Sequence, residues 1–321
     1  MKKILIKTLT IVVPLAVGIL LIWYSFNSAS PEERQTLWKH INNADPFWII
    51  ISLVLGMSSH ISRAYRWKYL VAPMGYQPRL SVSTMALMMG YLTNYGIPRS
   101  GEILRAATLS NYEGVPFQKS MGTIITERIV DLLMLLLIIL FAFSINTQFL
   151  LDYFSQIEVK NTTMFYVLGG SIFIIGIGIL IIKKLKFPFI EKVKKFLGEI
   201  YEGMLSVFKM KNKWLFIFHS LYIWIAYLFM FYCVKFCTPA TEEITFAAAL
   251  MAFIAGSFAM TTTNGGIGAF PVAVGLVLLV FNIDKPTGEA YGWIIWGSQT
   301  LLNIIVGGAS FIILPLFSKR K

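Results

Sequence analysis

The sequence contains little cysteine, histidine or charge. Only 2 cysteines and 3 histidines occur in 321 residues. Cys233 and Cys237 share one helical face of an apolar run, so neither a disulfide framework nor a zinc pattern follows, and we interpret both as packing residues. No metal-spaced cluster, nucleotide-type phosphate loop or nucleophile triad is visible, so we expect no metal and no cofactor.

Charged residues make up 14% of the chain, whereas 56% is apolar and the mean hydropathy is +0.69. These values describe an integral membrane protein rather than a soluble enzyme. The net charge of +12 invites a nucleic-acid partner. However, Lys and Arg lie in blocks beside apolar runs, as in loops that face an anionic leaflet, so we expect no nucleic-acid binding.

Apolar runs of about 20 residues can cross a bilayer. The sequence predicts an all-α polytopic membrane protein whose full spans lie at about 4–24, 47–67, 120–145, 163–185, 214–236 and 290–316. Basic and acidic connections alternate, which predicts a bacterial-type cytoplasmic membrane protein with both termini in the cytoplasm. The first run starts like a signal peptide but is long for one, so we favour an uncleaved span.

Two segments, 81–112 and 244–282, do not fit as ordinary spans. Each contains two short apolar helices around a break, and both neighbours of each segment lie on one side of the membrane. We predict broken or re-entrant helix pairs, one from each face, because non-helical backbone at that depth needs protein or water partners. The breaks at 94–97 and 264–267 share Asn, Gly and Ile before a proline. That similarity suggests an inverted repeat of the transporter kind, with chance similarity of two turns as the alternative.

We interpret residues 1–321 as a single transmembrane domain, with halves at 1–146 and 163–316 joined by an outside loop. Residues 187–209 place apolar side chains on one helical face and charged ones on the other. This pattern predicts an amphipathic helix on the cytoplasmic surface.

Ionisable residues gather at the first break. Pro98 interrupts the chain, so Ser100 would cap a helix that begins near Glu102. The N-terminus of that helix suits a phosphate, and Arg99 offers a fork of donors for one. Arg105 lies three residues beyond Glu102, so we expect these two side chains to pair. A capping turn with a salt bridge and no binding role is the alternative.

A second charged group opens a long apolar helix and consists of Glu127, Arg128 and Asp131. Charges in a span should face protein or water, so we expect pairing within this group or with Arg99 and Arg105. A titrating carboxylate here would couple transport to protons. An ion-pair cluster that only locks the broken helix is the alternative.

Three polar side chains near the inner end of the second predicted span receive no binding role. His60 and Arg63 share a helical face, and Arg66 lies close by. Because basic side chains near a helix end can extend to the membrane surface, we interpret the arginines as snorkelling residues.

The order of these motifs resembles the lysylphosphatidylglycerol synthase transmembrane-region family, also called flippase-like membrane proteins. The matching stretches are Arg66-Trp67, 94–102 with Arg105-Ala106, 127–131 and 264–271. The resemblance implies a membrane domain that moves aminoacylated lipid between leaflets. The soluble domain that makes this lipid in two-domain members has no counterpart here, so we expect no lysyl transfer. Stand-alone relatives are linked to other lipids, so the substrate does not carry over.

The leading hypothesis is a flippase or transporter for a phospholipid or a polyprenyl-phosphate-linked lipid. Its substrate-binding residues would be Asn94, Arg99, Glu102, Arg105, Glu127, Arg128, Asp131 and Asn264. The expected partners are that membrane lipid and either a second copy of the chain or a separate lipid synthase. The alternatives are a membrane-embedded lipid-modifying transferase and an accessory subunit of a lipid synthase. Enzyme activity is less favoured, and no catalytic residue is assigned, because no site for a soluble donor is visible.

Overall fold

A computed structural model describes residues 2–149 and 210–317, which form helices joined by short turns, without a β-strand in those ranges. The chain divides into two compact units. One consists of Met1–Leu135 with Lys211–Lys321, and the other of Leu136–Met210. The residues considered below belong to the first unit. The predicted span at 163–185 and the predicted surface helix at 187–209 lie outside the described residues.

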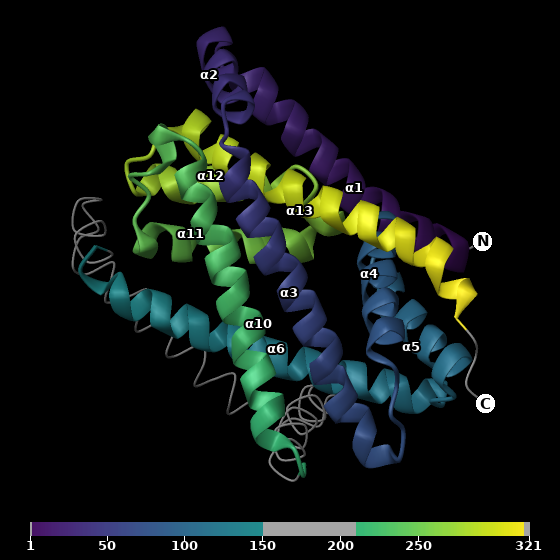
Figure 1. Cartoon of the computed structure of the whole chain (residues 1–321). Helices are drawn as coiled ribbons and strands as arrows, with labels where there is room; N and C mark the ends of the chain where they lie inside the picture. Colours follow the sequence, from purple (N-terminus) through teal and green to yellow (C-terminus); the bar gives the residue numbers. More distant parts are fainter. Residues whose placement is uncertain (1, 150–209, 318–321) are drawn as a thin grey trace, which may run out of the picture. The chain divides into compact units, whose positions relative to one another are not determined.

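Long helices dominate the described residues (Figure 1). They are α1 (Lys2–Ser28), α2 (Pro31–Asn42), α3 (Pro46–Val71), α4 (Leu80–Gly96), α5 (Ser100–Glu113), α6 (Phe117–Ile145), α10 (Lys213–Cys233), α11 (Phe246–Thr262), α12 (Ala269–Val280) and α13 (Lys285–Ile313). Short 3-10 turns separate or end them, namely η1 (Ala72–Met74), η2 (Val234–Cys237), η3 (Pro239–Thr241), η4 (Asn264–Gly266) and η5 (Leu314–Leu316).

Four helical stretches are long and apolar enough to cross a bilayer. They are Pro46–Met74, Phe117–Ile145, Lys213–Cys237 and Lys285–Leu316. Each contains one predicted span, so those predictions are confirmed as helices of membrane length. The predicted first span falls within α1, in which Leu15–Ser28 is a shorter apolar helix. The protein is therefore an all-α polytopic membrane protein.

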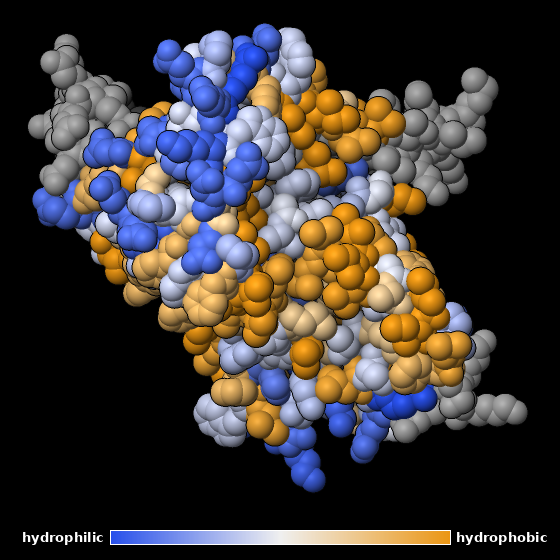
Figure 2. Space-filling model, turned by 45° about the horizontal axis from the view of Figure 1, so that its top comes forward, coloured by the Kyte–Doolittle hydropathy of each residue, from blue (hydrophilic) through white to orange (hydrophobic). Residues whose placement is uncertain are grey.

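The outer surface of these helices is apolar. Large hydrophobic side chains stand exposed, among them Val54, Phe229 and Ile305, which are 62%, 54% and 60% exposed. Figure 2 shows a face on which hydrophobic residues cover the middle while hydrophilic residues gather at its upper and lower edges. Such extended apolar surface is rare on soluble monomers and suits contact with lipid.

Polar caps in the sequence fix where several helices begin. At α2, the Ser30 Oγ accepts from the Glu33 amide at 3.1 Å and the Ser30 amide donates to the Glu33 carboxylate at 2.7 Å. Asp45, Thr245 and Asp284 accept amide hydrogens in the first turns of α3, α11 and α13. These bonds satisfy amides that would otherwise lack partners at the helix starts.

Helices α4 and α5 form the first helix hairpin. At its turn, the Asn94 Oδ1 accepts from the Gly101 amide at 2.8 Å. A Cβ at Gly101 would collide with the Gly90 carbonyl oxygen, so the two helices can approach this closely only with glycine there. The predicted first broken helix pair is thus present as a hairpin.

The cap predicted for α5 is wrong. Ser100 is the first residue of the helix, and its hydroxyl donates to the Ile97 carbonyl at 2.7 Å rather than accepting a helix amide. Arg99 is the N-cap residue, with φ of 62°, and makes no side-chain cap. The Ser100 hydroxyl also donates to the Thr93 carbonyl at 3.2 Å, and Asn94 on α4 supplies the acceptor for the helix start instead.

Helices α11 and α12 form the second hairpin, with η4 at its turn. Three glycines there, Gly265, Gly266 and Gly268, have positive φ. An L-residue with a side chain rarely adopts this conformation, so the glycines allow the chain to reverse. The second predicted broken pair is also present as a hairpin. Entry of either hairpin from one membrane face, and the inverted repeat, stay predictions.

The two hairpin turns meet beside the middle of α13. The Tyr95 ring lies against Gly265, where even a Cβ would collide with it. The Trp296 Nε1 of α13 donates to the Gly265 carbonyl at 2.7 Å. The Tyr95 hydroxyl donates to Thr300 Oγ1 at 3.3 Å and accepts from Asn303 Nδ2 at 3.2 Å. The turns of the two hairpins, about 170 residues apart in the sequence, therefore both contact the middle of α13.

The close contact within the first hairpin predicts that Gly101→Ala destabilises the protein. The added Cβ would lie 2.8 Å from Asn94 Nδ2 and would collide with the Gly90 backbone. We expect a loss of about 1–3 kcal/mol in the free energy of unfolding, as for overpacked cores, measured by thermal unfolding in detergent.

The matched control is Gly122→Ala in α6, because a Cβ there meets no atom within 4 Å. This change should be neutral or stabilise the helix by up to about 1 kcal/mol. Equal melting temperatures for the two variants would contradict the close packing of α4 on α5.

Candidate functional site

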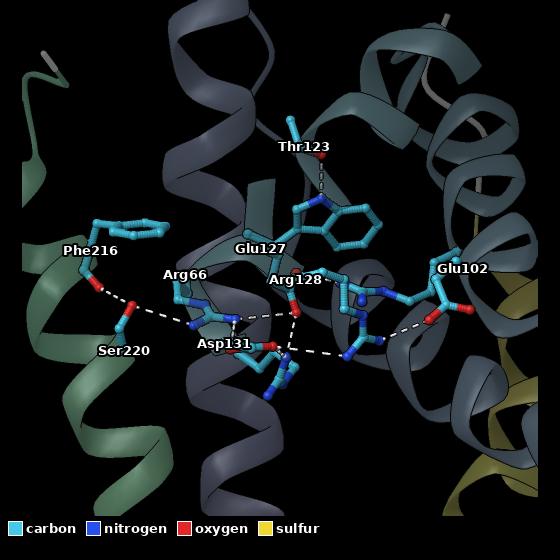
Figure 3. Close-up of polar contacts among 11 residues, drawn as sticks. Arg66, Glu102, Thr123, Glu127, Arg128, Asp131, Phe216 and Ser220 are labelled. Carbon is cyan, nitrogen blue, oxygen red and sulfur yellow. Dashed lines mark hydrogen bonds and ion pairs between the residues drawn. The ribbon is translucent and has the colours of Figure 1, made fainter. Parts of the chain in front are cut away.

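Seven charged side chains from α3, α5 and α6 converge in the first unit (Figure 3). We call them the ion-pair cluster, and they are Arg63, Arg66, Glu102, Arg105, Glu127, Arg128 and Asp131. Six of the seven ion pairs within the cluster join different helices, so helical spacing in the sequence could not indicate them.

Glu127 lies at the centre of the cluster and is fully buried. Its Oε1 accepts from Arg63 Nη1 at 2.6 Å, and its Oε2 accepts from Arg105 Nη2 at 2.9 Å. Arg66 Nη2 lies 3.4 Å from Oε1. The carboxylate therefore ties α6 to both α3 and α5, and three guanidinium groups compensate for its loss of water.

Asp131 lies one helical turn beyond Glu127 on the same face of α6. Its Oδ2 accepts from Arg63 Nη1 at 2.5 Å, and its Oδ1 accepts from Arg66 Nη2 at 2.8 Å. Arg63 thus bridges both carboxylates of α6. The expected pairing of this charged group with arginine is present, but the partners include two arginines from α3.

Arg63 and Arg66 contradict the snorkelling interpretation. Their exposed fractions are 4% and 0%, so neither reaches the membrane surface. The two lie at i and i+3 on the face of α3 that also buries Trp67. The available signal in the sequence was two arginines at i and i+3 beside a tryptophan within an apolar run. The arginines turn inward because they pair with Asp131 and Glu127.

The predicted pair between Glu102 and Arg105 is also wrong. Glu102 instead accepts from Arg128 Nη2 at 3.0 Å, at the edge of the cluster, where Arg128 is about half exposed. Arg105 turns away because its guanidinium carbon lies 4.4 Å from the ring centroid of Trp67, and it continues to Glu127. Attraction to an aromatic face and a buried carboxylate outweighs a local helical pair.

Neighbouring side chains hold the cluster in place. The Trp67 Nε1 donates to Thr123 Oγ1 at 2.8 Å, joining α3 to the start of α6. Figure 3 shows Arg66 between Asp131 and Ser220 of α10, with the Arg66 Nη1 to Ser220 Oγ distance at 3.4 Å. The Phe216 ring lies 5.8 Å from the Arg66 guanidinium carbon. Four helices therefore determine the orientation of these guanidinium groups.

The cluster is not fully satisfied by its own members. Four arginines face three carboxylates, so one positive charge is in excess. Within the described residues, several buried atoms have no hydrogen-bond partner, namely Arg63 Nε, Arg66 Nε, Arg105 Nε and Nη1, and Glu102 Oε2. Water or an anionic oxygen would satisfy the N–H groups. These N–H groups therefore keep unused capacity for an acceptor.

Three predicted site residues lie at the hairpin turns instead. Asn94 is engaged with the Gly101 amide, and Arg99 is exposed at the turn of the first hairpin. Asn264 is 2% exposed, and neither polar atom of its side chain has a partner in the described part of the chain. No hydrogen bond or ion pair among the described residues joins these three to the ion-pair cluster.

Cys233 and Cys237 are both buried free thiols, which confirms their interpretation as packing residues. No group of three or more Cys, His, Asp or Glu side chains with metal-binding geometry occurs in residues 2–149 and 210–317.

The fold and the cluster define a polytopic helical membrane protein with paired charges in its interior. The chain belongs to the family described as the lysylphosphatidylglycerol synthase TM region, whose model matches residues 11–307. It is also similar to the UPF0104 membrane protein MJ1595 of Methanocaldococcus jannaschii, with 24% identity over 320 residues, covering 88% of this chain and 89% of that protein. No solved structure is significantly similar. Family membership confirms the resemblance and gives the protein a role connected with membrane lipids.

The buried position of Glu127 predicts a large loss of stability in Glu127→Gln. This change leaves Arg63 and Arg105 without their shared counter-charge, which costs about 3–5 kcal/mol when a buried pair loses one partner. The matched change Glu102→Gln affects the partly exposed pair with Arg128 and should cost less than about 1 kcal/mol. Unfolding in detergent and denaturant measures both.

A second change tests whether the loss arises from uncompensated charge. Adding Arg105→Met to Glu127→Gln removes one stranded guanidinium, so part of the lost stability should return. Similar losses for Glu102→Gln and Glu127→Gln, or a purely additive double variant, would show that the cluster does not stabilise the fold by charge pairing.

Proposed function

We propose that this protein moves a phosphate-bearing lipid, either a phospholipid or a polyprenyl-phosphate-linked lipid, between the leaflets of the cytoplasmic membrane. Family membership supports a lipid substrate. One observation supports lipid movement rather than lipid binding alone. The two helix hairpins meet at the middle of α13, where the Tyr95 ring packs against Gly265.

The length of α13 indicates how deep in the membrane the two hairpin turns meet. Its 29 residues extend about 43 Å, enough to cross a bilayer. If α13 crosses, the hairpin turns lie near the bilayer centre, where non-helical backbone needs protein or water around it. Broken helices that meet at mid-depth line the substrate path in known transporter architectures. A lipid headgroup passing there would leave its acyl chains in the surrounding hydrocarbon.

Arg99 is the side chain best placed to meet the headgroup. It is exposed at the turn of the first hairpin, beside Ile97, which is 49% exposed. An arginine at this depth is costly unless water or an anion surrounds it, so a phosphate is a fitting partner. Its backbone is in the left-handed conformation, which is rare for arginine. Such strained residues cluster at functional sites, which supports a role for Arg99.

The ion-pair cluster would supply a second contact on the cytoplasmic side. Its excess positive charge and the free N–H groups of Arg105 favour a phosphate. Glu127 and Asp131 are occupied by arginines, so we assign them the positioning of these arginines rather than contact with a cationic headgroup. The basic connections between spans support a cytoplasmic location for both termini.

Translocation in proteoliposomes tests the proposal through Arg99. The purified wild type, Arg99→Ala and Arg99→Lys would be assayed with labelled phospholipids and labelled polyprenyl phosphates. We expect Arg99→Ala to slow exchange of the substrate lipid by about tenfold or more, since hydrogen bonds to charged groups contribute about 1.5–3 kcal/mol. Arg99→Lys should retain part of the rate, because it keeps the charge but loses the fork.

The matched control is Lys39→Ala, which removes an exposed cation of α2 away from both hairpins. It should leave the rate unchanged, and all variants should unfold at the wild-type temperature because neither side chain is buried. Exchange by Arg99→Ala at the wild-type rate would exclude the assigned contact. Recovery of a chemically altered lipid would favour the lipid-modifying transferase instead.

A further inference from the structure

A hollow at the junction of α1, α2 and α13 contains a buried carboxylate that the proposed function does not use. The hollow is shallow and partly open to solvent. Its polar lining consists of Ser25, Glu33, Arg34, Lys285 and Glu289. None of these residues belongs to the helices that build the ion-pair cluster, so the hollow is a separate site.

Glu289 is the central residue of the hollow. It is 4% exposed, and its Oε2 accepts from Ser25 Oγ at 2.7 Å. Its Oε1 is buried and has no hydrogen-bond partner among the described residues. The Lys285 Nζ forms a long ion pair with that oxygen at 3.9 Å, a distance beyond that of a hydrogen bond. A carboxylate oxygen can only accept, so the group that completes this site must carry an N–H or O–H donor.

The charges around Glu289 define the rest of the ligand. Arg34 lines the hollow and is exposed, and its guanidinium has no hydrogen bond or ion pair to another described residue. Glu33 is already engaged as the cap of α2. Lys285 is engaged in its ion pair with Glu289. The side-chain groups left without a hydrogen bond are therefore one buried carboxylate oxygen and one guanidinium. Together they suit a ligand that carries a cationic amine and an anionic phosphate.

Aromatic side chains place the hollow at the level of lipid headgroups. Trp23, Tyr24 and Trp38 are 62%, 64% and 50% exposed, and the Phe26 ring of the hollow lies 6.3 Å from that of Trp38. Exposed tryptophan and tyrosine concentrate where a membrane meets water. The apolar helix α1 and the hydrophilic helix α2 both line the hollow, as expected at a boundary between membrane and water.

We propose that this hollow binds the headgroup of a phospholipid with a primary amine, such as phosphatidylethanolamine. The ammonium donates to Glu289 Oε1, and Arg34 holds the phosphate. Ser25 orients the carboxylate by its bond to Oε2. Binding here requires no translocation, so the inference stands apart from the proposed function. A phosphate-linked primary amine is the chemistry recognised, and the membrane lipid is its source.

Lipid retention by the purified full-length protein tests the site. Native mass spectrometry would compare phosphatidylethanolamine with phosphatidylcholine, whose trimethylated amine has no N–H. We expect the wild type to bind phosphatidylethanolamine about tenfold more tightly, and Glu289→Gln to abolish that preference. The matched control Glu242→Gln changes an exposed carboxylate outside the hollow and should keep the preference.

A second variant keeps the test decisive if Glu289→Gln does not fold. Arg34→Gln alters an exposed side chain and should weaken both lipids equally, because it removes a contact with the phosphate they share. Soluble phosphoethanolamine should not displace the lipid. Equal retention of the two lipids by the wild type, unchanged retention in Arg34→Gln, or displacement by phosphoethanolamine at the affinity of the lipid would each overturn the assignment.

Discussion

The pairing of buried charges between α3, α5 and α6 is the interaction on which the rest of the first unit depends. An arginine or carboxylate inside a membrane protein carries a desolvation cost of several kcal/mol, so these helices can approach only where opposite charges meet. Glu127 satisfies this constraint by accepting from Arg63 on one side and Arg105 on the other. Because each carboxylate oxygen has its own donor, the relative positions of the three helices are specified as well as stabilised.

The first hairpin inherits its geometry from that pairing. Arg105 anchors α5 to the cluster, while at the start of α4 the Arg79 Nε donates to the Glu113 carboxylate at 2.7 Å. The turn of the hairpin is held separately, by Tyr95 against Gly265 and α13. With its base and its turn both fixed, the hairpin presents Arg99 at a defined place. The proposed contact with a lipid headgroup depends on this fixed position of Arg99.

Much of the fold followed from local sequence properties. Apolar runs near 120–145 and 214–236 become helices of membrane length because burial of apolar surface and internal backbone bonding favour the same structure. The second break was visible at 264–267, and the first lies slightly beyond its predicted place, because α4 continues to Gly96 and the chain turns at Ile97, Pro98 and Arg99. Glycine and proline indicate both interruptions. The cap of α5 was not visible, since Asn94 competes with Ser100 for the helix start only when α4 folds back onto α5.

Some features of the candidate site were also determined by the sequence, and others only by the tertiary structure. The sequence by itself determined that charges cluster at the first break and on α6, that the chain is a helical membrane protein, and which family it belongs to. Only the tertiary structure decided the partners. Arg63 and Glu127 are 64 residues apart, and Ser25 and Glu289 are 264 apart. Helical spacing relates side chains three or four positions apart on one helix, whereas these pairs depend on how separate helices pack, and burial then selects the partners that leave the fewest charges unpaired.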